Sequence, residues 1–99
     1  KNVTFSREKG LAEFPDSVTA RGAKHLVELA DMVALGHRAV MLYLVQRQDC
    51  KSLSVAADID PVYAEALATA KAAGVETLCY CCKMSAKEIR VDRALPVNF

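Results

Sequence analysis

The sequence has 99 residues, of which 53% are hydrophobic and 25% are charged, with a formal net charge of +1 at pH 7. These values are typical of one globular domain and give no bulk electrostatic case for binding nucleic acid or an anionic membrane. No apolar run approaches the roughly 18 residues of a transmembrane helix, so we expect no membrane partner. The four cysteines are not spaced like a secreted disulfide framework, which favours a reducing, cytoplasmic location.

The first third of the chain predicts a strand, a loop and a long helix. Residues 1–5 include β-branched and aromatic residues and predict the end of a strand, whereas residues 6–13 are mostly polar and predict an exposed loop. Apolar residues then recur at helical spacing and predict a helix over residues 17–35. Asp16 or Ser17 can cap its start, and the glycine at position 36 suits a left-handed end.

The middle of the chain predicts a buried strand followed by a second helix. Residues 38–46 contain a continuously apolar run, typical of a central parallel strand covered by helices on both sides. Residues 48–57 have a mixed pattern and are expected to be irregular. Asp60 as N-cap and Pro61 at the first helical position start a helix that ends at Gly74.

The last quarter of the chain predicts two strands and an edge segment. Residues 75–82 have high β-propensity, residues 84–87 resemble a turn, and residues 88–91 form a short strand that pairs back as a hairpin. Residues 95–99 contain Pro96, which favours an edge segment or tail. The order β-α-β-α-β-β predicts one α/β domain with a central, mixed, mostly parallel sheet flanked by helices.

The polar face of the first helix is the first candidate site. Arg21, Lys24, His25 and Glu28 lie at helical spacing and therefore share one surface. One interpretation is a solvated face with a Lys24–Glu28 pair worth about 0.3 kcal/mol. The other is a set of contacts to phosphate groups, which position a nucleic-acid backbone without reading its sequence.

Gln46 and Arg47 form a second candidate, because they follow the predicted central strand. Ligands of open parallel sheets gather at the carboxyl ends of the strands, where a polar pair is well placed to bind. The alternative is a strand that simply ends in polar residues at the surface. Both interpretations remain open from the residues alone.

The cysteines are expected to be buried, small apolar side chains. Cys79 and Cys81 share one face of a strand and Cys82 points to the other. Their spacing lacks the paired arrangement of zinc sites, and the only further cysteine is Cys50. We therefore predict no metal site within the chain itself.

Several motifs together resemble the sugar fermentation stimulation protein family, over nearly the whole chain. The most specific is the run FPDSVTARGAKHL. The matching segments are Lys1–Thr4, Phe14–Leu26, Leu44–Arg47, Asp60–Pro61 with Gly74–Glu76, and Leu95–Val97. The resemblance implies a restriction-endonuclease-like domain at the C-terminal part of a longer protein, whose N-terminal, OB-like region would be a partner. It also implies DNA binding and a role in regulating maltose use.

The resemblance further implies a catalytic role for one residue. Lys1 falls on the lysine of a Glu-x-Lys motif in a nuclease core; taken alone, it would be a solvated charge. Two carboxylates of such a core hold Mg²⁺ or Mn²⁺, which activates the attacking water, and both would precede Lys1. We therefore expect no cofactor in this chain and hydrolysis of DNA or RNA only in the full-length protein. Arg21, Lys24, His25, Gln46 and Arg47 would contact the nucleic acid. The alternatives are a DNA-binding regulator without catalysis, and an interaction domain without a polynucleotide substrate.

Overall fold

We describe the fold from a computed structural model, which covers residues 1–85 and 87–99. Two helices separate three groups of strands along the chain, and the first and last elements are strands. The elements are β1 (Asn2–Val3), β2 (Phe5–Glu8), β3 (Leu11–Phe14), α1 (Ala20–Ala34), β4 (Val40–Val45), β5 (Ser52–Val55), α2 (Pro61–Ala73), β6 (Glu76–Met84), β7 (Ile89–Ala94) and β8 (Val97–Asn98).

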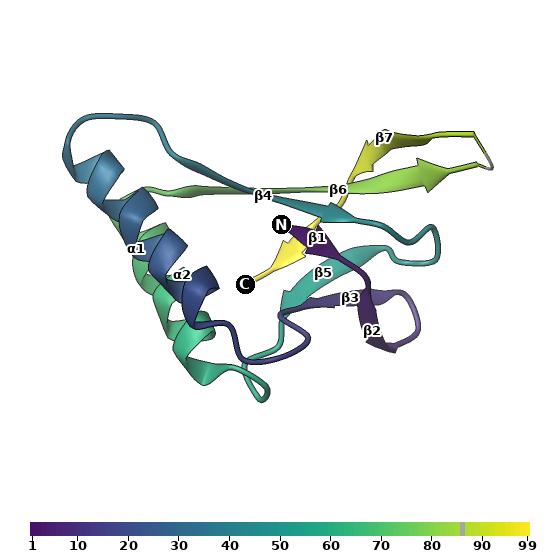
Figure 1. The fold of residues 1–99 in the computed structure, drawn as a ribbon, viewed down its shortest axis with the longest axis horizontal. Helices are drawn as coiled ribbons and strands as arrows, with labels where there is room; N and C mark the ends of the chain where they lie inside the picture. The colour runs from purple at the N-terminus through teal and green to yellow at the C-terminus, as the bar shows by residue number, and fades with distance from the viewer. Residues whose placement is uncertain (86) are drawn as a thin grey trace.

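The strands form two four-stranded sheets (Figure 1). The first has the order β1-β4-β6-β7, and the second has the order β2-β3-β5-β8. Neighbours are parallel except for the antiparallel pairs β2–β3 and β6–β7. The predicted α/β class with a mostly parallel sheet is therefore confirmed, although the strands divide between two sheets.

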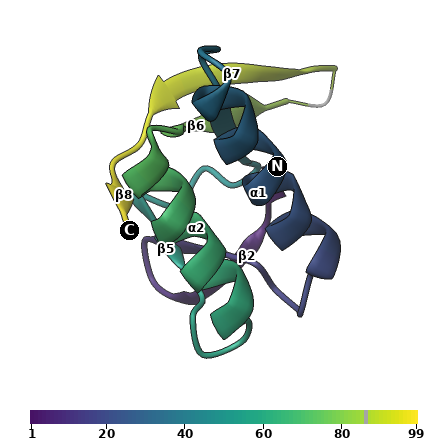
Figure 2. The same ribbon diagram turned by 90° about the vertical axis from the view of Figure 1, so that its left-hand side faces the viewer.

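The two helices lie side by side across one end of the sheets (Figure 2). The buried carboxylate of Asp60 joins their starts, because it accepts the backbone N–H of Thr19 at 2.8 Å and that of Tyr63 at 3.0 Å. Asp60 is thus the predicted N-cap of α2, and Gly74 ends that helix with φ of +109°.

The predicted start of α1 is wrong by three residues. The helix begins at Ala20, and its N-cap is Thr19, whose hydroxyl accepts the N–H of Gly22 at 3.0 Å. Asp16 and Ser17 lie in the exposed segment before it and do not cap the helix. The bond from Asp60 to Thr19 fixes where the helix starts, and this contact between residues 41 positions apart leaves no local sequence signal.

An aromatic cluster occupies the space between the sheets and the helices. Tyr43 of β4 and Tyr63 of α2 are fully buried, and their hydroxyl groups form a hydrogen bond of 2.5 Å. Phe14 packs edge-on against both rings, with centroids 5.6 Å from Tyr43 and 5.2 Å from Tyr63. Phe99 packs against Tyr43 at 5.5 Å. The core therefore joins β3, β4, α2 and the C-terminal residue.

The first sheet is closed on only one side. We call the face from which Tyr43 projects toward Tyr63 the inner face, and it is buried. On its outer face, Leu42 of β4 and Leu78 of β6 are directly paired, and their exposed fractions are 39% and 40%. Within the residues that the structure describes, no helix covers this outer face, although the sequence predicted helices on both sides of the strand.

Two segments that were expected to be irregular form strands of the second sheet. Residues 6–13, predicted as a loop, instead form the hairpin of β2 and β3, which turns at Gly10 with φ of +82°. Residues 48–57, predicted as irregular, contain β5. These strands are short and carry polar residues on the side away from the core, so they lack the apolar run that indicated β4.

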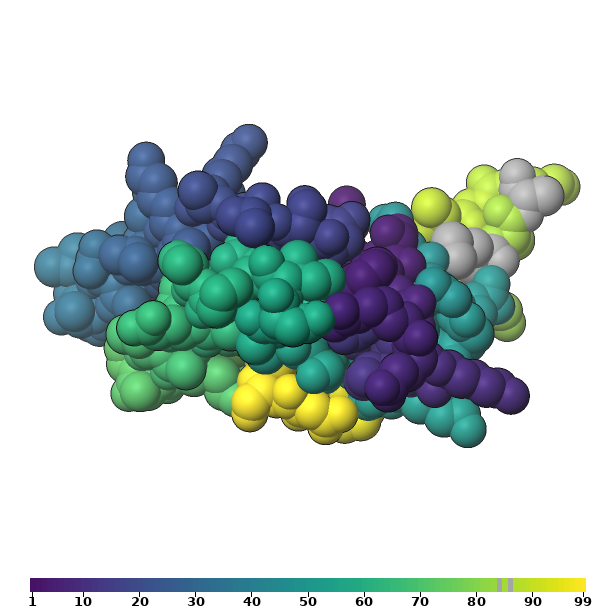
Figure 3. Space-filling view, turned by 90° about the horizontal axis from the view of Figure 1, so that it is seen from below, coloured from purple at the N-terminus to yellow at the C-terminus, as the bar shows by residue number. Residues whose placement is uncertain are grey.

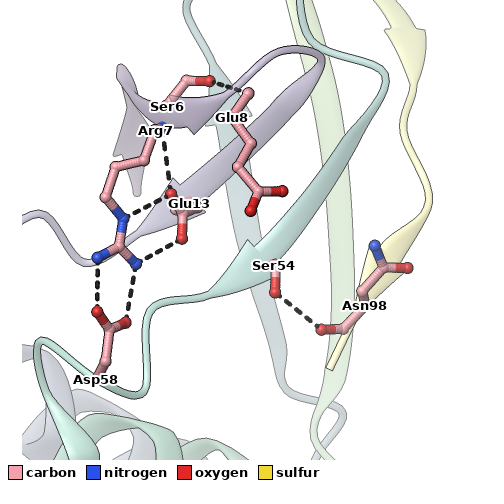
Figure 4. A network of polar contacts seen from close by, with 7 residues as sticks. All are labelled: Ser6, Arg7, Glu8, Glu13, Ser54, Asp58 and Asn98. Carbon is pink, nitrogen blue, oxygen red and sulfur yellow. Dashed lines mark hydrogen bonds and ion pairs between the residues drawn. The ribbon is translucent and has the colours of Figure 1, made fainter.

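A polar network holds this second sheet against the start of α2 (Figure 4). The Arg7 guanidinium donates to both oxygens of Glu13, at 2.7 and 2.9 Å, and to both oxygens of Asp58, at 2.6 and 2.8 Å. Glu13 is only 7% exposed. Arg7 thereby satisfies a buried carboxylate and ties the β2–β3 hairpin to the segment that leads into α2.

The C-terminal elements agree with the sequence predictions. β6 and β7 form the predicted hairpin, and β8 is the edge strand of the second sheet. The turn predicted at residues 84–87 includes position 86, which lies outside the described residues. The four cysteines are buried free thiols, as expected of apolar side chains. In the described part of the chain, neither helix is long and apolar enough to cross a membrane.

Candidate nucleic-acid interface

The clearest contact among the candidate residues joins Lys1 to His25. Lys1 directly precedes β1, where its carbonyl oxygen accepts the N–H of Leu44 at 2.8 Å. His25 lies on α1, and its Nδ1 atom is 2.9 Å from the Nζ atom of Lys1. An ammonium group can only donate, so Nδ1 is the acceptor of this bond. The structure thus brings together two residues that are 24 positions apart.

This contact lies on the wall of an open hollow of about 500 Å³. Lys1, His25 and Glu28 supply its polar lining, while Leu29 of α1 and the first half of β4 supply its apolar lining. The helix is amphipathic, because Gly22 and Leu26 face the core while residues one turn apart on the other side meet solvent. The sequence pattern of α1 therefore leaves its polar residues on the solvent side, where His25 and Glu28 line the hollow with Lys1.

Arg21 and Lys24 are exposed cations on the same helix. Neither forms an ion pair within residues 1–85 and 87–99, and the predicted Lys24–Glu28 pair is not formed. Their charges are consequently not neutralised by the protein. Together with Lys1, they give this side of α1 three positive groups that can donate hydrogen bonds.

Gln46 and Arg47 lie further along the first sheet than the hollow around Lys1. Val3 pairs with Val45, so Gln46 is about three residues, or roughly 10 Å, beyond the level of Lys1. The Gln46 amide donates to the side chain of Asn2 at 3.3 Å.

Arg47 is already engaged by protein groups. It donates to Asp49 at 2.6 and 2.9 Å and to the carbonyl oxygen of Thr4 at 3.3 Å. The bonds from Arg47 lower the pKa of Asp49 to about 2. The structure therefore does not bring this pair to the hollow around Lys1.

The hollow does not fit a divalent metal ion by itself. Glu28 is the single carboxylate on its wall, and the Lys1 ammonium group lies beside it. Within the described residues, no group of three or more His, Cys, Asp or Glu could hold a metal. The cysteines lie outside this hollow and do not favour a metal either. Burial raises the pKa of the Cys79 thiol to about 11, which disfavours the thiolate that metal binding needs.

Two participants were not identified from the sequence as parts of the site. Glu28 was placed on the polar face of the helix but not among the residues expected to contact nucleic acid, and Asn2 was noted only as part of a motif. Glu28 follows His25 by three positions, and residues three apart share one helix face. This spacing could have placed Glu28 beside His25 at the hollow. The contact of Asn2 with Gln46 depends on strand pairing and gives no local signal.

Comparisons with known proteins agree on one family. A family model described as "Sugar fermentation stimulation protein RE domain" matches residues 1–88. A sugar fermentation stimulation protein homolog of Roseobacter denitrificans is 61% identical over 98 residues, which are 99% of this chain and 42% of that protein. A homolog of Ruegeria pomeroyi is 72% identical over 78 residues, or 79% of this chain and 34% of that protein.

A solved structure has the same fold. It is titled "The structure of Pyrococcus Furiosus SfsA in complex with Ca2+", and it superposes with a TM-score of 0.91 at 29% sequence identity. The match covers 100% of this chain and 43% of that chain. The present chain thus spans about two fifths of the length of such relatives. From the match of the family model and the conserved fold, we conclude that the chain belongs to the sugar fermentation stimulation protein family.

Proposed function

We propose that the full-length protein binds DNA or RNA and that the polar side of α1, with Lys1, contacts the phosphate backbone. The observation that carries this proposal is the bond between Lys1 and His25, because it fixes the lysine at the hollow beside α1. A structural role does not require a cation held on an open surface by a histidine. A negatively charged ligand, in contrast, would use it directly.

The residues of the hollow suit backbone contacts better than base recognition. Lys1 lines the hollow, and Arg21 and Lys24 are exposed on the same helix as His25; none of the three forms an ion pair with a described residue. Charged donors of this kind bind phosphate oxygens and set the position of a polynucleotide without specifying its sequence. His25 orients Lys1 by accepting its hydrogen bond. Gln46 would extend the contact along the strands by its amide group.

We further propose that the full-length protein hydrolyses phosphodiester bonds, with Lys1 as a catalytic residue. A fixed ammonium group can stabilise the negative charge that develops on a phosphoryl group in the transition state. A divalent ion such as Mg²⁺ or Mn²⁺ would need more carboxylate ligands than Glu28, the single one that the hollow supplies. We therefore assign any such ligands to the part of the full-length protein beyond these 99 residues.

The alternative is a regulator of sugar metabolism that binds DNA without cleaving it. It is favoured by the exposed cations Arg21 and Lys24, because such side chains can bind a phosphate backbone without any metal ion. The two functions share the interface on α1 and differ only in whether Lys1 takes part in a reaction.

The experiment compares binding and cleavage by the full-length protein. Labelled single-stranded DNA, RNA and duplex DNA are incubated with the protein in Mg²⁺, Mn²⁺ or EDTA, and binding is measured at several salt concentrations. The nuclease should bind in all conditions and cleave only with metal. The Lys1→Ala variant should lose cleavage and keep most of its affinity, because several other cations remain.

Each hypothesis has an outcome that contradicts it. Undiminished cleavage by Lys1→Ala would remove Lys1 from the reaction. Salt-dependent binding without cleavage in any metal would leave only the regulator. Absence of salt-dependent binding to all three polynucleotides would exclude both, since phosphate contacts release counterions and are necessarily salt-sensitive.

A further inference from the structure

The β6–β7 hairpin extends beyond the rest of the first sheet. β4 pairs with β6 only from Glu76 to Cys81, whereas β6 continues to Met84 and pairs there with β7 alone. We call residues 82–85 and 87–91 the hairpin arm. It projects from the body of the protein in the ribbon and space-filling views (Figures 1 and 3). All residues of β7 are exposed, so within the arm only Cys82, at its base, is buried among the residues whose burial is described.

The arm concentrates positive charge in an unfavourable arrangement. It contains Lys83, Lys87 and Arg90 and one acidic residue, Glu88, a net charge of +2, whereas the whole chain has a net charge of +1. Lys83 and Arg90 are directly opposite each other on neighbouring strands. Like charges in this position destabilise a pair of strands, and a two-stranded hairpin is already only marginally stable. Stability of the isolated protein therefore does not explain this sequence.

The groups around this pair leave its charge available. Arg90 donates to Glu88, but both side chains are more than half exposed, so the pair is screened by solvent. Lys83 and Lys87 form no ion pair with any residue that the structure describes. A hollow of about 230 Å³ is lined by Lys83, Ser85, Glu88 and Arg90. A phosphate group placed there would relieve the repulsion between Lys83 and Arg90.

We propose that the hairpin arm is a second contact for the polynucleotide backbone, with Lys83 and Arg90 binding phosphate groups. The proposal rests on the proposed function and extends its interface. β1 and β7 are the opposite edges of the first sheet, about 15 Å apart at the usual strand spacing. Lys1 is level with Cys79 of β6, and Lys83 is four residues further along that strand, which adds about 13 Å in the strand direction. The two contacts are therefore about 20 Å apart, which corresponds to about six nucleotides of one strand. A single polynucleotide can thus meet Lys1 near one edge and the arm at the other.

The test measures equilibrium binding of labelled duplex DNA to the full-length protein in EDTA over a range of salt concentrations. The variant K83Q/R90Q should bind about tenfold more weakly at moderate salt. The slope of log K against log salt should also fall by about two, since each lost phosphate contact removes about 0.9. The variant K83R/R90K keeps both charges and should bind within about twofold of the wild type.

A matched control separates a local contact from a change in net charge. Arg38→Gln with Lys71→Gln removes the same number of charges from exposed positions at the other end of the sheet, after α1 and in the last turn of α2. It should leave the affinity within about twofold of the wild type. The proposal is overturned if K83Q/R90Q keeps the wild-type affinity and slope, or if the control loses as much as K83Q/R90Q does. If the proposed function itself is wrong, the wild-type protein will not bind duplex DNA at all. This result is distinct from both outcomes above, and it would also overturn the role of the arm.

Discussion

The two faces of the first sheet have similar amino acids and opposite environments. On the inner face, Tyr43 and Val45 are completely buried beneath the second sheet and α2. On the outer face of the same strand, Leu42 is 39% exposed and pairs with the equally exposed Leu78. The alternation of side chains along β4 places each residue on one face or the other. What differs is the presence of a covering layer.

This difference separates stability from binding in the molecule. The inner face holds the aromatic cluster that joins both sheets to α2. The polar residues of α1 lie at the rim of the sheet, where they can meet a ligand without disturbing that cluster. We therefore expect substitutions on the inner face to affect unfolding and substitutions at the rim to affect binding.

The largest effect is expected for Tyr43→Ala. Removing this fully buried ring leaves a cavity among Phe14, Tyr63 and Phe99. The free energy of unfolding should fall by about 3–5 kcal/mol, as for other large aromatic residues in protein cores. Urea unfolding measures this value. A loss below about 1 kcal/mol would mean that the inner face is not the core.

The next largest effect is expected when the hydrogen bond between the hydroxyl groups of Tyr43 and Tyr63 is removed. Tyr43→Phe keeps the ring but leaves the buried hydroxyl of Tyr63 without its partner, so it should cost about 1–3 kcal/mol. Tyr63→Phe should cost a similar amount. The double variant should cost less than the sum, because it leaves no unpaired hydroxyl. Additive losses in this double-mutant cycle would contradict the bond.

A third prediction concerns the second sheet, whose face away from the core is covered by an ion pair. Arg7 lowers the pKa of Glu13, and it lowers the pKa of Asp58 to about 2. A lowered pKa stabilises the folded state above the pKa of the unfolded chain, near 4.3 for Glu. That stabilisation is lost as the pH falls through the folded-state pKa.

Glu13→Gln should therefore lower the free energy of unfolding at pH 7 by roughly 1–2 kcal/mol. The variant should also lose less stability than the wild type between about pH 4 and pH 2. Unfolding curves at several pH values give both quantities. Parallel pH profiles for the two proteins would show that Glu13 does not contribute through its charge.

The smallest effect is expected on the outer face. Leu42→Ala removes a side chain that is already 39% exposed, so we expect a loss below about 1.5 kcal/mol in residues 1–99 alone, less than a fully buried leucine costs. The same urea measurement applies. A loss as large as that of Tyr43→Ala would abolish the contrast between the two faces.

The sequence predicted those features that have local causes. Asp60 and Gly74 marked both ends of α2, and the apolar run of residues 38–46 marked β4. Features that depend on distant partners were not predictable. The start of α1 at Thr19 is set by Asp60, and the polar strands β2 and β5 are stabilised by pairing with β3.

The candidate site follows the same rule. The helical spacing of Arg21, Lys24 and His25 correctly placed them on one helix, but only the fold shows that His25 meets Lys1. An apolar strand also cannot reveal which of its faces is covered. Resemblance to the family directed attention to Lys1, which as an isolated terminal lysine carries no signal of its own.

The account depends most on the claim that the polar side of α1 binds the phosphate backbone. The direct measurement is the salt dependence of polynucleotide binding by the full-length protein and its Arg21→Gln/Lys24→Gln variant, with Arg38→Gln/Lys71→Gln as the charge-matched control. We predict that the slope of log K against log salt falls by about two on duplex DNA for the α1 variant and stays unchanged for the control. Equal slopes for the wild type and the α1 variant would contradict the interface on α1.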